Sequence, residues 1–80
     1  SMRDAGILDG DALVVKHKER VRSGDIVVAL VNNETTVKYY YPLKNGRLEL
    51  RPANSDFETQ TYNATDVTMQ GIVIGLQRDY

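Results

Sequence analysis

Few side chains in this sequence can act as a nucleophile or as a base. The 80 residues contain no Cys and one His, which excludes a thiolate nucleophile, a disulfide, a Cys-based zinc site and a multi-histidine metal site within the chain. If the chain is an enzyme, its nucleophile is a hydroxyl group, and its base is a carboxylate, a lysine or His17. We expect no cofactor.

Charge and hydropathy restrict the partners of the chain. Ten Lys and Arg against eleven Asp and Glu give a net charge of -1, so we expect no broad attraction to DNA phosphates or to anionic lipid. No apolar run approaches the ~20 residues of a membrane span, and the first residues lack the order of a signal peptide. We therefore expect a folded domain in the cytoplasm that does not itself bind DNA or a membrane.

Short apolar segments separated by turn residues predict one mainly β domain over residues 1–80, a small and strongly twisted antiparallel assembly. Strands are expected at 12–15, 26–31, 34–41, 47–51 and 67–76, with a short edge strand at 59–62. Asn32-Asn33 and Asn45-Gly46 predict hairpin turns. The continuous apolar run at 26–31 is typical of a strand covered on both faces.

Proline and glycine mark further positions along these strands. Pro42 is expected to end regular pairing of the third strand, because proline has no N–H to donate. Gly71 and Gly75 predict a bend or a close backbone approach in the last strand.

Five sequence blocks occur in a fixed order along nearly the whole chain. They are Ser1 to Asp11 before an apolar strand, Gly24 to Ala29, Glu34 to Lys38, the set Pro52, Asn54 and Phe57, and Gly71 to Gly75. In this order they resemble the C-terminal, self-cleaving serine-lysine peptidase domain of the LexA and UmuD family. The resemblance implies that the chain begins at the catalytic serine, without the cleavage segment and the N-terminal DNA-binding domain of its parent.

The resemblance places the nucleophile at Ser1 and the general base at Lys38, and the spacing between them is that of the family pattern. Lysine accepts a hydroxyl proton only as the neutral amine, so its usual pKa of about 10.4 must fall, and burial among apolar groups lowers it. Thr36 shares the strand face of Lys38 and is expected to orient the amine. Backbone N–H groups around Ser1 and Met2 are the expected oxyanion donors.

The resemblance also implies a biological role. Members of the family cut one bond, typically Ala-Gly, in their own upstream segment when a RecA-DNA filament stabilises the cleavable conformation. In repressors this cut releases a helix-turn-helix domain from the dimerising domain and derepresses DNA-damage genes of the SOS response. We expect such a repressor domain, a homodimer formed through strand edges, with little peptidase activity in the absence of its tethered segment.

Two alternatives stay open at this point. One is a UmuD-like subunit of a translesion polymerase, which self-cleavage would activate, and the other is a noncatalytic dimerisation module of a phage-type repressor. The ending from Gly71 to Tyr80 looks closer to LexA repressors than to UmuD.

Three other features have simpler interpretations. His17 lies within the charged run Lys16 to Arg20, so we expect a solvated loop and not a catalytic base. Strand alternation would bury one face of the run Tyr39 to Tyr41 and expose the other, so we expect half-buried sheet residues and not a stacking platform for bases. Asp9 and Asp11 flank Gly10, and a turn before a strand explains them without a metal.

Overall fold

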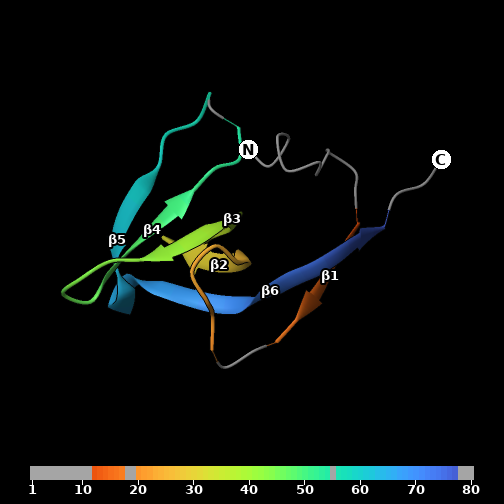
Figure 1. The fold of residues 1–80 in the computed structure, drawn as a ribbon, viewed down its shortest axis with the longest axis horizontal. Helices are drawn as coiled ribbons and strands as arrows, with labels where there is room; N and C mark the ends of the chain where they lie inside the picture. Colours follow the sequence, from red (N-terminus) through yellow and green to blue (C-terminus); the bar gives the residue numbers. More distant parts are fainter. Residues whose placement is uncertain (1–11, 18–19, 55, 78–80) are drawn as a thin grey trace.

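The computed structural model describes residues 12–17, 20–54 and 56–77 of the chain. Its strands are β1 (Ala12–Lys16), β2 (Ile26–Val31), β3 (Glu34–Pro42), β4 (Arg47–Arg51), β5 (Gln60–Asn63) and β6 (Val67–Gln77), and the 3-10 turn η2 (Ala64–Asp66) links β5 to β6. The strands form one sheet in the order β1-β6-β2-β3-β4-β5, and every neighbouring pair is antiparallel (Figure 1). This confirms the mainly β, antiparallel fold class.

Two turns connect the central strands. Asn32 and Asn33 have φ angles of 52° and 65°, the left-handed values that a two-residue type I′ hairpin requires, and the turn brings Val31 opposite Glu34. In the loop from β3 to β4, Asn45 and Gly46 also have positive φ angles, 65° and 71°. Both hairpins predicted from these dipeptides are confirmed.

One face of the sheet, called here the inner face, carries the apolar core. The buried residues are Val27, Ala29, Val31, Leu48, Leu50 and Ile72, and Val21, Tyr40, Tyr62, Val67 and Met69 pack against them. All of these except Val21, which precedes β2, come from β2, β3, β4, β5 and β6, and they lie on one side because alternate residues of paired strands share a face. The core therefore fixes the registers that bring β3, β4 and β5 together.

The interpretation of β2 as a strand covered on both faces was wrong in part. Its inner residues are buried, but Ile26, Val28 and Leu30 are only half-buried. Within the part of the chain that the structure describes, all strands belong to one sheet, so no second layer covers the outer face. A continuous apolar run in the sequence does not distinguish a strand that is buried on both faces from a strand that is buried on one face and half-buried on the other.

Tyr39, Tyr40 and Tyr41 are all half-buried, which confirms the expectation of half-buried sheet residues, although alternation alone would leave one face exposed. Tyr40 packs on the core. Tyr41 lies on the outer face, where the Arg51 guanidinium lies 3.8 Å from its ring centroid and covers it. A neighbouring side chain on β4 thus shields a ring that alternation alone would leave exposed.

Pro42 ends β3 but still lies opposite Leu48 of β4. Two residues earlier, the backbone N–H of Tyr40 points away from β4, since it donates a hydrogen bond to the Asp25 carbonyl oxygen at 2.8 Å. By alternation the nitrogen of Pro42 also points away from β4, so no bond to β4 is lost. Proline therefore ends the strand one residue later than expected.

The last strand bends at its glycines, as predicted. The pairing of β6 with β2 shifts register around Gly71, and its pairing with β1 shifts around Gly75. A Cβ atom at Gly71 would overlap Cγ1 of Val15 and lie 3.1 Å from the Lys16 carbonyl oxygen. Glycine at this position thus lets β1 close onto β6.

Candidate active site

The first half of β3 has a strand neighbour on one side only. Residues 34–39 pair with β2, whereas pairing with β4 begins at Tyr39, opposite Arg51. Antiparallel strands direct the N–H and C=O groups of successive residues to opposite sides. Val31 and Glu34 flank a two-residue hairpin turn, so their backbone groups hydrogen-bond to each other. Because the bonding direction alternates along a strand, the backbone N–H and C=O groups of Thr36 and Lys38 also point toward β2.

The backbone groups of Thr35 and Val37 therefore point to the other side of β3. No described strand pairs with them there, and we call this stretch the open edge of β3. An open strand edge is a template on which an extended peptide can add as a further strand.

Lys38 extends from the inner face to this open edge. Its side chain is partly buried, and its Nζ lies 3.4 Å from the Val37 carbonyl oxygen, to which it donates a long hydrogen bond. Desolvation by burial lowers the pKa of Lys38, because a less hydrated environment disfavours the ammonium form. This is the direction that a lysine base needs, since only the neutral amine accepts a proton.

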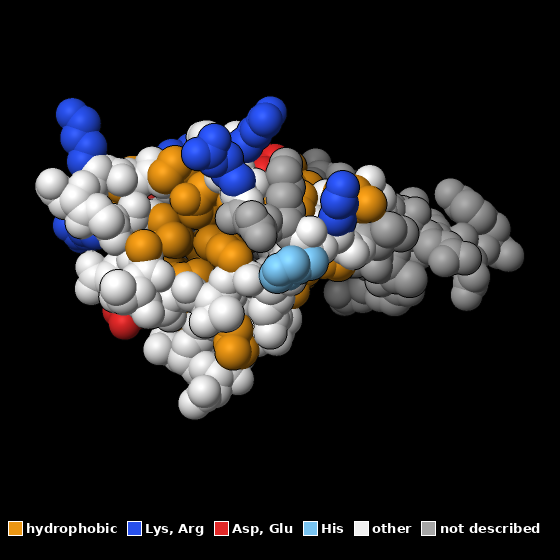
Figure 2. Space-filling view, turned by 90° about the horizontal axis from the view of Figure 1, so that it is seen from below, with side chains coloured by type: hydrophobic (Ala, Val, Ile, Leu, Met, Phe, Trp, Pro, Cys, Tyr) orange, Lys and Arg blue, Asp and Glu red, His pale blue; other side chains and the backbone are white. Residues whose placement is uncertain are grey.

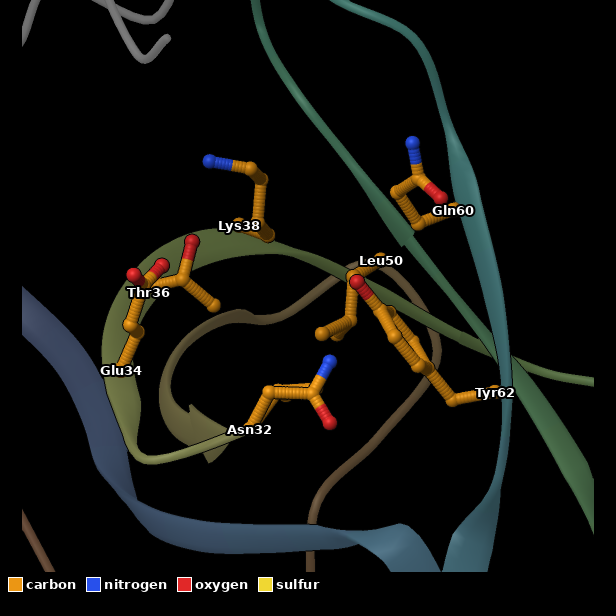
Figure 3. Close-up of a pocket in the computed structure, with 8 residues that line it drawn as sticks. Asn32, Glu34, Thr36, Lys38, Leu50, Gln60 and Tyr62 are labelled. Atoms are coloured by element: carbon orange, nitrogen blue, oxygen red, sulfur yellow. The ribbon is translucent and has the colours of Figure 1, made fainter.

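A pocket of about 150 Å³ adjoins Lys38 on the inner face. It is lined by Val31, Asn32, Glu34, Thr36, Lys38, Leu50, Gln60 and Tyr62. Side chains of β3 approach it from one side and side chains of β5 from the other, with Leu50 of β4 between them (Figure 3). The arrangement provides a lysine amine, a threonine hydroxyl and a side-chain-sized cavity next to an open strand edge.

The predicted site residues fall into two groups. Thr36 and Lys38 share the inner face of β3, as alternation predicted, and both line the pocket. Ser1 and Met2 lie outside the described residues, so their distance to Lys38 stays a prediction. Asp9 and Asp11 also lie outside the described residues.

His17 is exposed just after β1, which confirms the expected solvated position. In a space-filling view the histidine lies at the surface, near an apolar area bordered by Lys and Arg side chains (Figure 2).

The sequence interpretation gave no site role to six of the lining residues, which are Val31, Asn32, Glu34, Leu50, Gln60 and Tyr62. Asn32 was assigned only to the hairpin turn, and Gln60 and Tyr62 only to an edge strand. The signal for Gln60 and Tyr62 lay in the register that sets Tyr62 opposite Leu48 and Gln60 opposite Leu50, which local patterns do not reveal.

The loop that follows β4 carries the fourth sequence block. Asn54 is buried, and its Oδ1 accepts a hydrogen bond from the Asp56 N–H at 3.0 Å, while its carbonyl oxygen accepts one from the Phe57 N–H at 3.1 Å. These bonds turn the chain back toward β5. The Phe57 side chain is 55% exposed.

Fold and site together define a mainly β domain with a partly buried lysine beside an open strand edge. The Peptidase S24-like family model matches residues 1–74, and the chain belongs to this family.

Its curated relatives include several LexA repressors. The chain is 45% identical over 80 residues to the LexA repressor of Erythrobacter litoralis (strain HTCC2594), covering 100% of this chain and 34% of that protein. It is 49% identical over 79 residues to that of Bordetella parapertussis, covering 98% and 36%, and 46% identical over 80 residues to that of Moorella thermoacetica, covering 100% and 38%. The chain thus spans about a third of the length of these relatives.

Proposed function

We propose that this chain is the catalytic domain of a LexA-type repressor that cuts a peptide bond in its own upstream segment with a Ser1–Lys38 dyad. The observation that carries the proposal is the position of Lys38, partly desolvated and with a lowered pKa, at the open edge of β3. A solvated surface lysine keeps its proton at neutral pH and is no base. Membership of the Peptidase S24-like family supports the same chemistry.

In the proposed reaction the upstream segment adds to the open edge of β3 in extended form. The neutral Lys38 amine takes the Ser1 hydroxyl proton as Ser1 Oγ bonds to the carbonyl carbon of an Ala-Gly bond. Backbone N–H groups near Ser1 and Met2 stabilise the oxyanion. The C–N bond then breaks, the Lys38 ammonium returns its proton to the leaving amine, and water later hydrolyses the acyl-serine ester.

Thr36 is the proposed positioning residue for the amine. It lines the same pocket and projects from the same face of β3 two residues before Lys38 (Figure 3). Its hydroxyl can accept a hydrogen bond from the amine and so restrict the rotamers of a long, flexible side chain.

The names of the relatives favour a repressor over a UmuD-like subunit, since those compared are LexA repressors. We propose that DNA binding resides in a separate N-terminal domain of the whole protein and that a RecA-DNA filament triggers the cut in the DNA-damage response, in the cytoplasm. No helix among the described residues is long and apolar enough to cross a membrane.

We also propose that the domain forms a homodimer through strand edges. In the described sheet, β6 pairs with β2 through residues 67–72 and with β1 through residues 72–77. The last residues of β6 thus have no described partner on the β2 side, and Ile74 in this stretch is 62% exposed. An apolar strand end of this kind favours pairing with a second copy.

Self-cleavage of the whole protein tests the dyad. The protein with its upstream segment is incubated from pH 7 to 10, with and without a RecA-DNA filament, and the products are resolved by mass. We expect Ser1→Ala and Lys38→Ala each to abolish the cut, whereas Lys44→Ala, at an exposed lysine, leaves it unchanged. Full cleavage by Lys38→Ala would remove the proposal.

The same assay measures what tethering contributes. Intramolecular placement of a substrate is worth about 7–11 kcal/mol, so the 80-residue chain should cut the segment very slowly when it is added as a separate peptide. Equal rates for tethered and separate segments would contradict this account.

A further inference from the structure

The pocket beside Lys38 has an apolar floor. Leu50 is 2% exposed and Val31 is 7% exposed, and both line the pocket. The aromatic ring of Tyr62 extends from β5 toward Leu50 and bounds the cavity on that side (Figure 3). A cavity of about 150 Å³ with such a floor matches a compact aliphatic side chain, because apolar surface favours apolar contact.

The rim of the pocket is polar and carries two side chains that can be charged. Asn32 and Gln60 contribute neutral carboxamides, whereas Glu34 contributes a carboxylate and Lys38 an amine. Glu34 projects from the same face of β3 as Lys38, four residues earlier. When Lys38 acts as a base it is neutral, and Glu34 is then the one charged side chain among the lining residues.

The position of the pocket relates it to the open edge. A peptide strand that bonds to Thr35 and Val37 directs alternate side chains to the inner and outer faces of the sheet. The pocket lies on the inner face, directly beside this stretch of β3. One side chain of a bound peptide therefore points at the cavity.

Resting on the proposed function, we propose that this pocket is a specificity site. It admits an uncharged aliphatic side chain of the bound peptide, and the Glu34 carboxylate rejects an acidic one. Leu50 and Tyr62 provide apolar contact for an aliphatic side chain, and the Glu34 carboxylate repels an acidic one. The selectivity is therefore the difference between the binding free energies of the two peptides.

The size of the repulsion follows from the position of Glu34. Its side chain is exposed, so water screens its charge, and charge pairs at exposed sites change binding by about 0.2–1 kcal/mol, or roughly 1.4- to 5-fold. The discrimination should be largest at low ionic strength and should shrink as the Debye length falls to about 3 Å in 1 M salt.

Peptide binding followed by NMR tests the proposal. The ligands are short poly-threonine peptides with blocked ends and one variable residue, Leu, Gln or Glu. Threonine favours an extended chain, and its uniform repeat lets the variable residue reach the pocket in any register. The amide resonances of Thr35 and Val37 report docking at the edge, and the Leu50 methyl resonances report occupation of the pocket.

We expect all three peptides to shift the edge resonances, with affinity falling from Leu to Gln to Glu. Gln and Glu are isosteric, so their ratio isolates the charge, and we expect about a 1.4- to 5-fold preference for Gln. Glu34→Gln should bring this ratio close to one without changing the affinity for the Leu peptide. The matched control is Glu49→Gln, which removes a carboxylate whose partner Arg51 lies over Tyr41 on the outer face, and it should leave the ratio unchanged.

The outcomes separate the two proposals. Edge shifts with equal binding of Gln and Glu peptides, or a preference that survives in Glu34→Gln, overturn the specificity site and leave the proposed peptidase untouched. Tighter binding of the Glu peptide overturns it as well. If no peptide shifts the Thr35 and Val37 resonances at millimolar concentration, the docking edge itself is wrong, and the substrate placement in the proposed function fails with it.

Discussion

The amine of Lys38 lies between two environments. The inner face removes water from its surroundings and lowers its pKa, while the Val37 carbonyl oxygen, at 3.4 Å, accepts a hydrogen bond from it at the open edge. Burial favours the neutral amine, whereas a hydrogen bond donated to a carbonyl is strongest for the ammonium. The net direction is downward, so desolvation is the larger effect.

The lowered pKa predicts how stability changes with pH. Between the folded-state pKa of Lys38 and its ordinary value of 10.5, the unfolded chain binds more protons than the folded one, so the free energy of unfolding rises with pH in this window. Below the window the folded state carries the full cost of a partly desolvated charge. Urea denaturation from pH 7 to 10 should therefore show a rise that is absent in Lys38→Met.

Lys44→Met is the matched control for this measurement, because Lys44 is exposed in the loop between β3 and β4. Its stability profile should run parallel to that of the unchanged protein. If the Lys38→Met profile also runs parallel, burial does not lower the pKa of Lys38.

The sequence predicted which residues of one strand share a face, but it did not predict which residues of different strands lie in the same pocket. Thr36 and Lys38 were predicted to share a face because strand alternation is fixed by backbone geometry. Gln60 and Tyr62 reach the same pocket only through the pairing of β5 with β4 and of β4 with β3. That placement depends on two registers and on the curl of the sheet, none of which is encoded locally.

At the scale of elements, the open edge exists because neighbouring strands differ in length. β3 has nine residues and β4 has five, and the hairpin between them pairs them from Pro42 back to Tyr39 only. The Pro52 to Asp56 stretch then leaves the sheet, guided by the Asn54 hydrogen bonds. The first half of β3 is thus left available on one side.

Proline substitution distinguishes the two sides of β3. The Thr35 N–H points to the open edge, whereas the Thr36 N–H bonds toward β2. Proline lacks an N–H and is tolerated in strands where that group faces solvent. We expect Thr36→Pro to cost about 1–3 kcal/mol more than Thr35→Pro in urea denaturation, because it leaves a ladder carbonyl without its donor. Equal losses would show that β3 has no open edge at Thr35.

The closure of β1 on β6 provides a second prediction for the elements. A Cβ at Gly71 would overlap a Val15 methyl group, so we expect Gly71→Ala to destabilise the domain by about 1–3 kcal/mol, as overpacking does. Adding Val15→Ala should recover part of this loss, although the nearby Lys16 carbonyl oxygen remains. A thermodynamic cycle of the four variants measures the coupling, and a coupling of zero would contradict the proposed contact.

Elements were predictable where the signal was local. The Asn32-Asn33 and Asn45-Gly46 turns required positive φ angles, and both dipeptides tolerate them. The glycines of β6 marked its irregular pairing. The pairing of β1 with β6 was not predictable, because it joins the two most distant strands of the chain and no turn between them specifies it.

At the scale of the whole molecule, the described domain is one curled sheet with a core on its inner face and half-buried apolar residues on its outer face. The sequence predicted an antiparallel β assembly from alternation and turn spacing. It did not predict that β2 would have one buried and one partly open face, because coverage of a sheet depends on which other parts of the protein lie against it.

The end of β6 provides a test of self-association. Ile74 is 62% exposed on a stretch that extends beyond its pairing with β2. A charge there opposes apolar strand pairing, so Ile74→Asp should lower the average mass in sedimentation at high micromolar concentration. Phe57→Asp is the control, since Phe57 is similarly exposed at 55% but lies in a loop. Equal effects of both substitutions would refute an interface at β6.

The pairing of the first and last described strands also sets the order in which the domain assembles on the ribosome. Ala12 lies opposite Gln77, so β1 cannot pair with β6 until the segment between them and β6 itself have been synthesised. At roughly 5–20 residues per second of synthesis, β6 follows β1 by several seconds, whereas β2 and β3 form a hairpin in about 1–10 μs. The β2–β3–β4 hairpins are therefore expected to nucleate the nascent domain, with β6 adding to β2 and β1 closing last. Until then β1 remains an unpaired apolar segment, so pulse-labelling hydrogen exchange should find its amides the last to gain protection.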